Sequence, residues 1–166
     1  MKRFIWPIVI VAFVVFYASG GTLLWKNTSK QILSSGKVAL VKYRSFLNDQ
    51  FVYGAFVISN ATLPARQPNN TVTNTVTYHW VLDGPDGRTE GQATIGDSSP
   101  IQFGETNAAP GARAFWSYRN PMQGYIEPGT YGANGTYLCV TEFEQIPEGQ
   151  LSEVSCEYVE PKAHNK

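Results

Sequence analysis

The chain has one long apolar run near its start and then short segments in which apolar and polar residues alternate. No residue between Phe4 and Trp25 carries a charge, and the run is apolar on every side. A helix of about 20 residues, rising about 1.5 Å per residue, crosses a hydrocarbon layer of roughly 30 Å. A surface helix of a globular protein would carry a polar stripe. The pattern therefore predicts one transmembrane signal-anchor helix within residues 1–25.

A cleaved signal peptide is the alternative interpretation of the same segment. Lys2 and Arg3 precede the apolar stretch, and Ala18–Gly20 offers small residues at a cleavage position. The apolar run continues beyond this position to Trp25, which favours an uncleaved anchor. N-terminal sequencing of the mature protein distinguishes the two interpretations.

Beyond residue 36 the chain shows the period-two alternation of β-strands. The clearest example runs from Val72 to Leu82, where Val76, Tyr78 and Trp80 share the face that we expect to be buried. Strands are predicted over residues 37–46, 51–59, 72–82, 88–95, 113–119, 135–143 and 151–159.

The segments between these strands are rich in turn-forming residues. Asp83–Gly87 consists of turn-forming residues and is predicted to close a hairpin. Its two Asp residues do not indicate a calcium loop, because the further carboxylates of such a loop are missing. Loops are predicted over residues 61–71, 96–112 and 120–134. No amphipathic helix separates the strands, so the pattern of seven or eight short strands predicts an all-β, antiparallel sandwich.

The length of the chain limits its organisation to one soluble domain. Of 166 residues, those outside the apolar run suit a single hydrophobic core. Residues 26–36 are expected to continue the membrane helix as a juxtamembrane stalk that ends at Gly36. The β-domain is predicted over residues 37–160, followed by a tail over residues 161–166.

Two cysteines are placed symmetrically about a predicted turn. Cys139 and Cys156 lie in the last two predicted strands, on either side of Ile146–Gly149. An antiparallel hairpin at this turn brings their Cβ atoms opposite each other, so we predict a disulfide bond and place the Cys face toward the core. Such a bond persists in an oxidising compartment, which locates the domain in the periplasm or the extracellular or lumenal space. The alternative is a pair of reduced, buried thiols.

The sequence around the first cysteine resembles the immunoglobulin-like superfamily. Tyr137 stands two residues before Cys139, and Trp80 lies on an earlier strand. The resemblance covers residues 51–159 and implies an immunoglobulin-like sandwich. No cysteine precedes Trp80, so the inter-sheet disulfide of antibody domains cannot form. The resemblance implies no ligand, because such folds support many functions.

Charge and motifs indicate neither an enzyme nor a nucleic-acid-binding protein. Thirteen Lys and Arg balance thirteen Asp and Glu, so the chain has no net basic charge to attract nucleic acid. His79 and His164 are not at ligand spacing from a cysteine, and no nucleophile or phosphate-loop motif is present. We therefore expect no catalytic residue, no cofactor and no metal site.

Aromatic residues in the second half of the chain are the candidate contacts for a partner. Tyr and Trp dominate the binding energy of many interfaces. Trp116 and Tyr118 alternate on one strand, where completing the core is the competing interpretation. The candidates are Trp116, Tyr118, Tyr125 and Tyr131.

These observations leave two hypotheses for function. The first is a membrane-anchored, non-enzymatic module that contacts the lipid bilayer through its N-terminal helix and docks another membrane or envelope protein. The alternative is a secreted or anchored domain that binds a ligand or glycan through its loop aromatics. A binding experiment with candidate proteins, beside a glycan array, separates the two.

Overall fold

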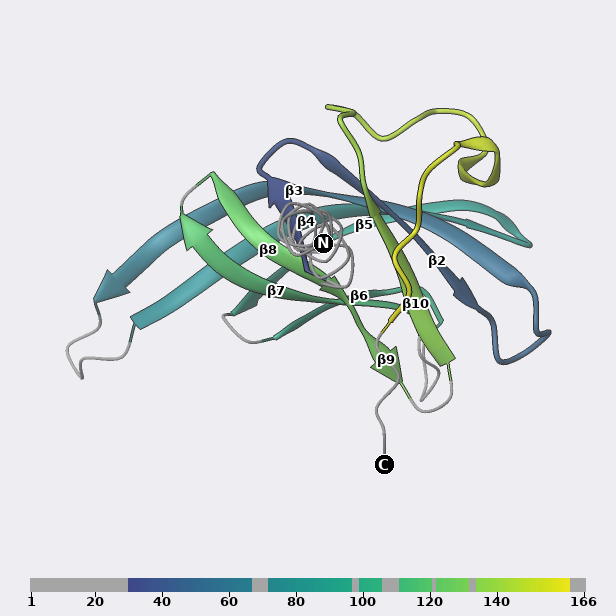
Figure 1. Ribbon diagram of the computed structural model, residues 1–166, viewed down its shortest axis with the longest axis horizontal. Helices are drawn as coiled ribbons and strands as arrows, with labels where there is room; N and C mark the ends of the chain where they lie inside the picture. The colour runs from purple at the N-terminus through teal and green to yellow at the C-terminus, as the bar shows by residue number, and fades with distance from the viewer. Residues whose placement is uncertain are drawn as a thin grey trace, which may run out of the picture.

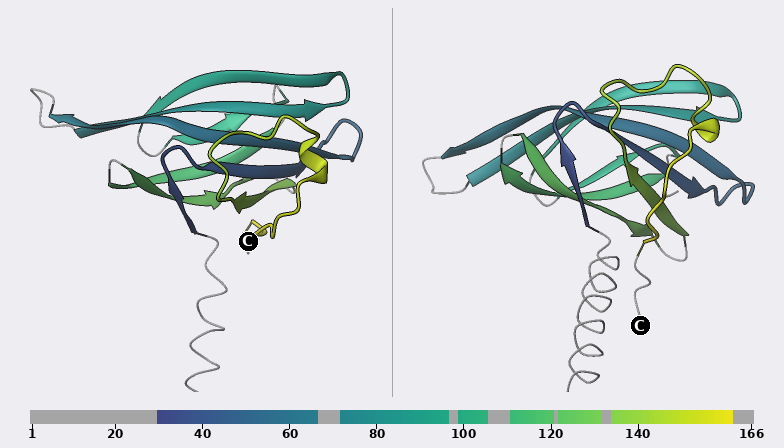
Figure 2. Two further views of the ribbon diagram at one scale, coloured as in Figure 1. Left: turned by 90° about the horizontal axis from the view of Figure 1, so that it is seen from above. Right: turned by 45° about the horizontal axis from the view of Figure 1, so that its top comes forward.

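Two antiparallel sheets stacked face to face form the protein (Figures 1 and 2). The computed structural model describes residues 30–66, 72–96, 99–105, 111–120, 122–131 and 134–161. The predicted transmembrane run from residue 4 to 25 lies outside these ranges. Within them, no helix is long and apolar enough to span a bilayer. The all-β, two-sheet prediction is thus confirmed, and the membrane helix stays a prediction.

The larger sheet has six strands and the smaller has four, and all neighbouring strands are antiparallel. The six-stranded sheet has the order β5 (Gly87–Gly96), β4 (Val72–Gly84), β3 (Phe51–Arg66), β2 (Val38–Arg44), β10 (Asn134–Val140) and β9 (Thr130–Tyr131). The four-stranded sheet has the order β1 (Gln31–Ser34), β8 (Gln123–Pro128), β7 (Ala112–Asn120) and β6 (Pro100–Phe103). A short 3₁₀ helix, η1 (Leu151–Glu153), follows β10.

The main core fills the space between the two sheets. On β4, Val76, Tyr78 and Leu82 point into it, as the alternation predicts. Trp80, from the same face, is only partly buried and stacks on Phe103, with ring centroids 5.5 Å apart. The prediction that Trp80 belongs to the core is therefore confirmed in part, at the margin of the cluster.

A second, smaller core lies on the outer face of the six-stranded sheet. Strand β2 is buried on both faces, because Ala39 and Val41 point between the sheets while Val38 and Leu40 point outward. The C-terminal strap (residues 141–160) covers these outward side chains. The buried residues of this second core are Val38, Leu40, Ala55, Val81, Cys139 and Leu151.

The strap corrects two predictions about the last part of the chain. Residues 151–159 were expected to form a strand, yet they hold η1 and an irregular segment whose backbone pairs with β10 only at the Leu138–Val159 bridge. The Cys face of β10 was expected to face the main core, whereas Leu138 occupies the main core and Cys139 the second one. Both faces of β10 are buried, and the alternation of side chains along a strand cannot show which of two buried faces packs in the main core.

Other boundaries also differ from the sequence prediction. Strand β1 lies inside the predicted stalk and pairs with β8, so the domain starts before residue 37. Strands β6 and β8 lie in the segments 96–112 and 120–134, which were predicted as loops. Strand β3 extends through Arg66, into the loop predicted over residues 61–71. These strands contain Gly, Pro or Asn, which weaken the strand signal although pairing with a neighbour stabilises them.

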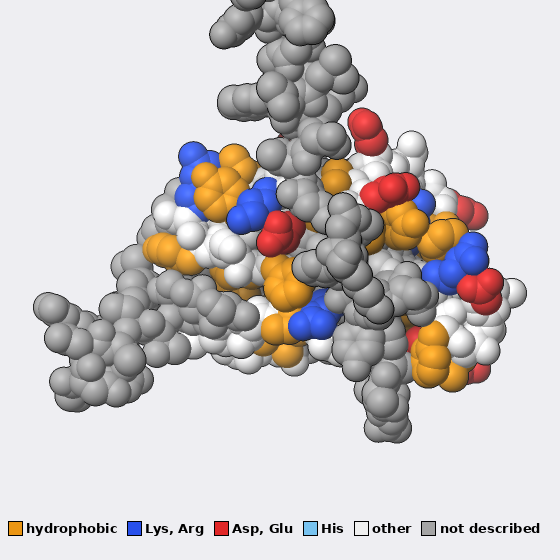
Figure 3. Space-filling model, turned by 60° about the horizontal axis from the view of Figure 1, so that its bottom comes forward, with side chains coloured by type: hydrophobic (Ala, Val, Ile, Leu, Met, Phe, Trp, Pro, Cys, Tyr) orange, Lys and Arg blue, Asp and Glu red, His pale blue; other side chains and the backbone are white. Residues whose placement is uncertain are grey.

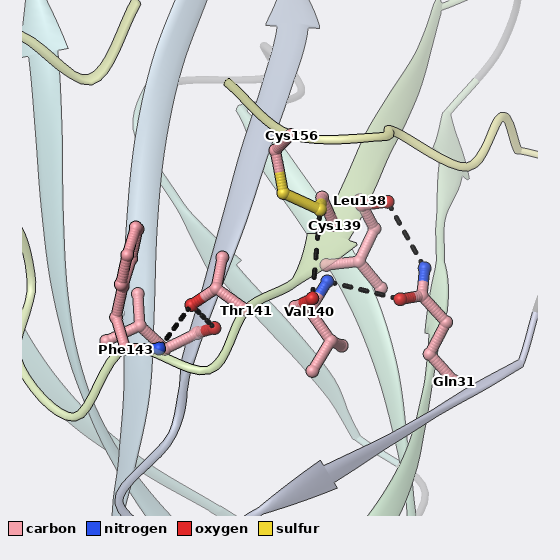
Figure 4. Close-up of a disulfide and its surroundings, with 8 residues drawn as sticks. Gln31, Leu138, Cys139, Val140, Thr141, Phe143 and Cys156 are labelled. Atoms are coloured by element: carbon pink, nitrogen blue, oxygen red, sulfur yellow. Dashed lines mark hydrogen bonds between the residues drawn. A yellow bond between two sulfur atoms is a disulfide. The ribbon is translucent and has the colours of Figure 1, made fainter. Parts of the chain in front are cut away.

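Strand β1 is tied to the opposite sheet by one side chain (Figure 4). The Gln31 amide nitrogen donates to the Leu138 carbonyl at 3.3 Å, and the Val140 N–H donates to the Gln31 amide oxygen at 3.1 Å. The Leu138 carbonyl also accepts the Val159 N–H at 2.8 Å, whereas the Gln31 side chain supplies the acceptor for the Val140 N–H.

Replacing Gln31 by Leu is expected to lower the free energy of unfolding by about 1–3 kcal/mol, because it leaves a partly buried Val140 N–H without its acceptor. Denaturant unfolding of the purified protein measures the difference. Replacing the exposed neighbour Lys30 by Ala serves as the control and should leave stability nearly unchanged. Equal stability of the Gln31 variant and the parent would contradict the bridging role.

Candidate functional site

The disulfide and neighbouring backbone bonds fix the start and the end of the strap on β10 and β2. Cys139 and Cys156 are joined with their Cα atoms 6.2 Å apart, as the sequence predicted (Figure 4). Thr141 donates through its backbone N–H and its hydroxyl to the Val38 carbonyl, at 3.0 and 2.8 Å. Both ends of the strap are therefore secured beside the second core.

The middle of the strap is held by the β4–β5 hairpin. The Arg88 guanidinium donates to the carbonyls of Pro147, Glu148 and Gly149, at distances between 2.6 and 3.1 Å. The Asp83 carboxylate accepts the Leu151 N–H at 2.6 Å. Asp83–Gly87 forms the predicted turn, and its first residue binds the backbone of the strap.

The β2–β3 turn is ordered by its polar residues and exposes its apolar ones. Asp49 adopts a left-handed conformation, with φ of 58°, and forms an ion pair with Arg44 at 3.1 Å. The same turn presents three large apolar side chains to solvent: Phe46 is 52 % exposed, Leu47 74 % and Phe51 40 %. Phe46 and Leu47 on the turn, with Phe51 at the start of β3, thus expose three large apolar side chains beside one another in the sequence.

A cleft of about 510 Å³ lies between this turn, the β4–β5 turn and the strap. Its walls come from residues 48–53, from residues 83–88 and from residues 148–152. Phe51 belongs both to the exposed turn and to the wall of the cleft. The volume falls in the range of sites that hold small ligands or single side chains of a partner. We call the cleft together with Phe46, Leu47 and Phe51 the turn–strap surface.

A cluster of rings around one lysine continues this surface across β2 and β10. The Lys42 ammonium lies over the rings of Phe51, Tyr137 and Tyr158, at 5.3, 5.2 and 4.5 Å from their centroids. Burial, together with the smaller effect of the nearby Tyr53, raises the pKa of Tyr158 to about 12. Tyr158 is thus uncharged at neutral pH and contributes a cation–π contact, not an ion pair.

The four aromatic residues predicted to contact a partner fall in different environments. Trp116 is 5 % exposed and belongs to the main core, which was the competing interpretation of that strand. Tyr125 is 37 % exposed on β8, and Tyr118 is partly buried on β7. The side chain of Tyr131 lies outside the described part of the structure. A contact role for Tyr118, Tyr125 and Tyr131 stays a prediction.

The side chains of the described ranges do not form a metal-binding cluster. No three or more of their His, Cys, Asp or Glu residues are placed so that they could hold one metal ion. His79 lies on the polar face of β4 and faces Glu90 at 3.4 Å. Both cysteines in the chain are joined to each other. The chemistry that this surface offers is recognition by apolar, aromatic and cationic groups.

Sequence reasoning missed the turn–strap surface, although one signal was present. Leu47 lies between the strands predicted over residues 37–46 and 51–59, and an apolar residue in such a connection has no strand face to occupy. The cleft had no comparable signal, because its walls lie far apart in the sequence. For the same reason, the sequence did not indicate that Arg88 binds the backbone of the strap.

The structure thus defines a two-sheet antiparallel β-sandwich with the turn–strap surface at one end of its larger sheet. The chain matches no protein-family model, no curated protein and no solved structure. Functional inference therefore rests on the physical properties of its own residues.

Proposed function

We propose that this protein is a membrane-anchored, immunoglobulin-like module that docks another membrane or envelope protein outside the cytoplasm, without catalysing a reaction. The observation that carries the proposal is the exposure of Phe46, Leu47 and Phe51 on one ordered turn. Burying such side chains against a partner releases free energy at about 25 cal/mol per Å² of apolar area. The adjoining cleft offers space for a side chain of that partner.

The anchor and the compartment belong to the same proposal. The charge-free run from Phe4 to Trp25 supports a membrane span. The joined pair Cys139 and Cys156 supports an oxidising compartment. The immunoglobulin-like assignment is supported by the two-sheet arrangement and by the packing of Trp80 at the margin of the core.

Site-specific photocrosslinking of the full chain in its native membrane tests the docking surface. A photoreactive residue at Leu47 is expected to give a discrete protein adduct, because this side chain is 74 % exposed in the proposed contact. The same residue at Gln92, which is exposed on β5, should give none. Adducts of equal intensity from both positions, or from neither, would rule out this surface as the docking site.

A second pair of variants separates loss of binding from loss of folding. Introducing Phe46→Ser, with the photoreactive residue still at Leu47, should reduce the adduct at least several-fold while the melting temperature stays within a few degrees, since Phe46 is half exposed. Undiminished crosslinking would show that the turn does not carry the contact.

The alternative function, ligand or glycan binding, is favoured by the volume and mixed lining of the cleft. The cleft joins the ring of Phe51 to polar groups of Gln50 and Ser152, a combination that suits a sugar ring. A glycan array probed with the full chain in detergent tests it. Specific glycan binding that is lost in Phe51→Ala would favour this alternative over a protein partner.

A further inference from the structure

The outer face of the four-stranded sheet carries exposed apolar and basic side chains together. Ile32 on β1 lies directly across from Tyr125 on β8, and the two are 46 % and 37 % exposed. Met122, at the adjoining end of β8, is 65 % exposed. On the next strand, Ser117 lies across from Tyr125 and is also exposed. The platform so formed by β1, β8 and β7 is separate from the turn–strap surface.

Basic side chains surround these apolar ones. Arg119 stacks on Tyr125 at 5.5 Å and Arg113 on Phe115 at 5.1 Å. Lys30 is exposed immediately before β1. Glu127 is the single acidic residue in the four strands of this sheet. Figure 3 shows hydrophobic patches with Lys or Arg side chains directly beside them.

The platform lies close, along the chain, to the predicted membrane span. Strand β1 begins at Gln31, and the charge-free run ends at Trp25. The five residues from Lys26 to Lys30 reach at most about 18 Å when fully extended. If the run is inserted, the start of β1 therefore lies close to the bilayer surface. Tyr rings beside apolar and basic side chains are the composition that favours a membrane–water interface.

We propose that this platform rests on the surface of an anionic lipid bilayer. Ile32 and Tyr125 lie at the level of the headgroups, and Lys30 and Arg119 pair with lipid phosphates. Each basic residue near such a surface adds attraction that salt screens. The inference rests on the anchoring in the proposed function and goes beyond it, because it orients the domain and leaves the turn–strap surface available for a partner.

Spin labels on the two outer faces of the sandwich test this orientation. The full chain is reconstituted in phosphatidylcholine vesicles with and without phosphatidylserine, and a nitroxide is attached at Ser117→Cys or, as the control, at Gln92→Cys. Gln92 is exposed on β5, where its neighbours Gly91 and Ala93 face the other way, toward Trp80 and the main core. Collision rates with oxygen, which concentrates in lipid, and with a nickel chelate, which stays in water, measure the environment of each label.

We expect the label at Ser117 to show a several-fold higher ratio of oxygen to nickel collisions than the label at Gln92, with the larger difference in phosphatidylserine vesicles. The double variant Lys30→Gln and Arg119→Gln should remove the dependence on phosphatidylserine. A water-like label at Ser117 would overturn the inference. So would a label shielded from both reagents, which indicates that protein covers this face.

Vesicle flotation separates failure of this inference from failure of the proposed function. A chain that floats with the vesicles at alkaline pH but carries a water-like label at Ser117 is anchored with the platform turned away, so only the orientation is wrong. A chain that does not float is not anchored, which contradicts the proposed function and this inference together.

Discussion

Replacing Trp116 by Ala is expected to lower the free energy of unfolding by about 3–5 kcal/mol, the largest effect of any single substitution proposed for this protein. The indole is 5 % exposed and packs in the main core. It also lies over the backbone of Gly124, where any Cβ atom would overlap the ring. The cavity left by Ala cannot be filled by a neighbouring side chain at that glycine. Equilibrium unfolding in denaturant measures the loss.

The control for Trp116 is a residue of the same sheet that points the other way. Tyr125→Ala removes a ring that is 37 % exposed and should change the free energy of unfolding by less than about 1 kcal/mol. Trp80→Ala should fall between the two, because Trp80 is only partly buried. A Trp116 variant as stable as the Tyr125 variant would mean that the core is assigned to the wrong face of β7.

Opening the Cys139–Cys156 bond is expected to lower the free energy of unfolding by about 3 kcal/mol, because a closed loop with a sequence separation of 17 restricts the unfolded chain. The double variant Cys139→Ser and Cys156→Ser should show this loss in denaturant unfolding. Such a loss is a large part of the stability of one small domain.

Reduction of the parent protein supplies the matched control for the double variant. The reduced parent and the variant should unfold at the same denaturant concentration, since both lack the same constraint. Alkylation before reduction should add no label, and alkylation after reduction should add two. Two thiols that react in unreduced protein taken from cells would contradict both the bond and the oxidising compartment.

Several features of this protein follow from the sequence alone. Alternation along Val72–Leu82 identified a strand and its buried face, because a pleated strand places every second side chain on one side. The symmetry of Cys139 and Cys156 about a predicted turn indicated the disulfide, and the bond is present although a strap replaces the regular hairpin from which it was inferred. The Asp83–Gly87 turn followed from its residue types.

Other features were decided only by the tertiary structure. Strand β1 forms because β8 pairs with its backbone and its own Gln31 side chain bonds to β10, and neither β8 nor β10 is near it in the sequence. The segment around Cys156 matched a strand by composition, yet it packs as a strap, and its Leu151 and Val154 bury apolar surface against Val38 and Leu40 in the second core. The turn–strap surface joins three distant segments through Arg88 and Asp83. Local sequence specifies what one strand or turn prefers, whereas these features depend on contacts between segments that only the folded chain brings together.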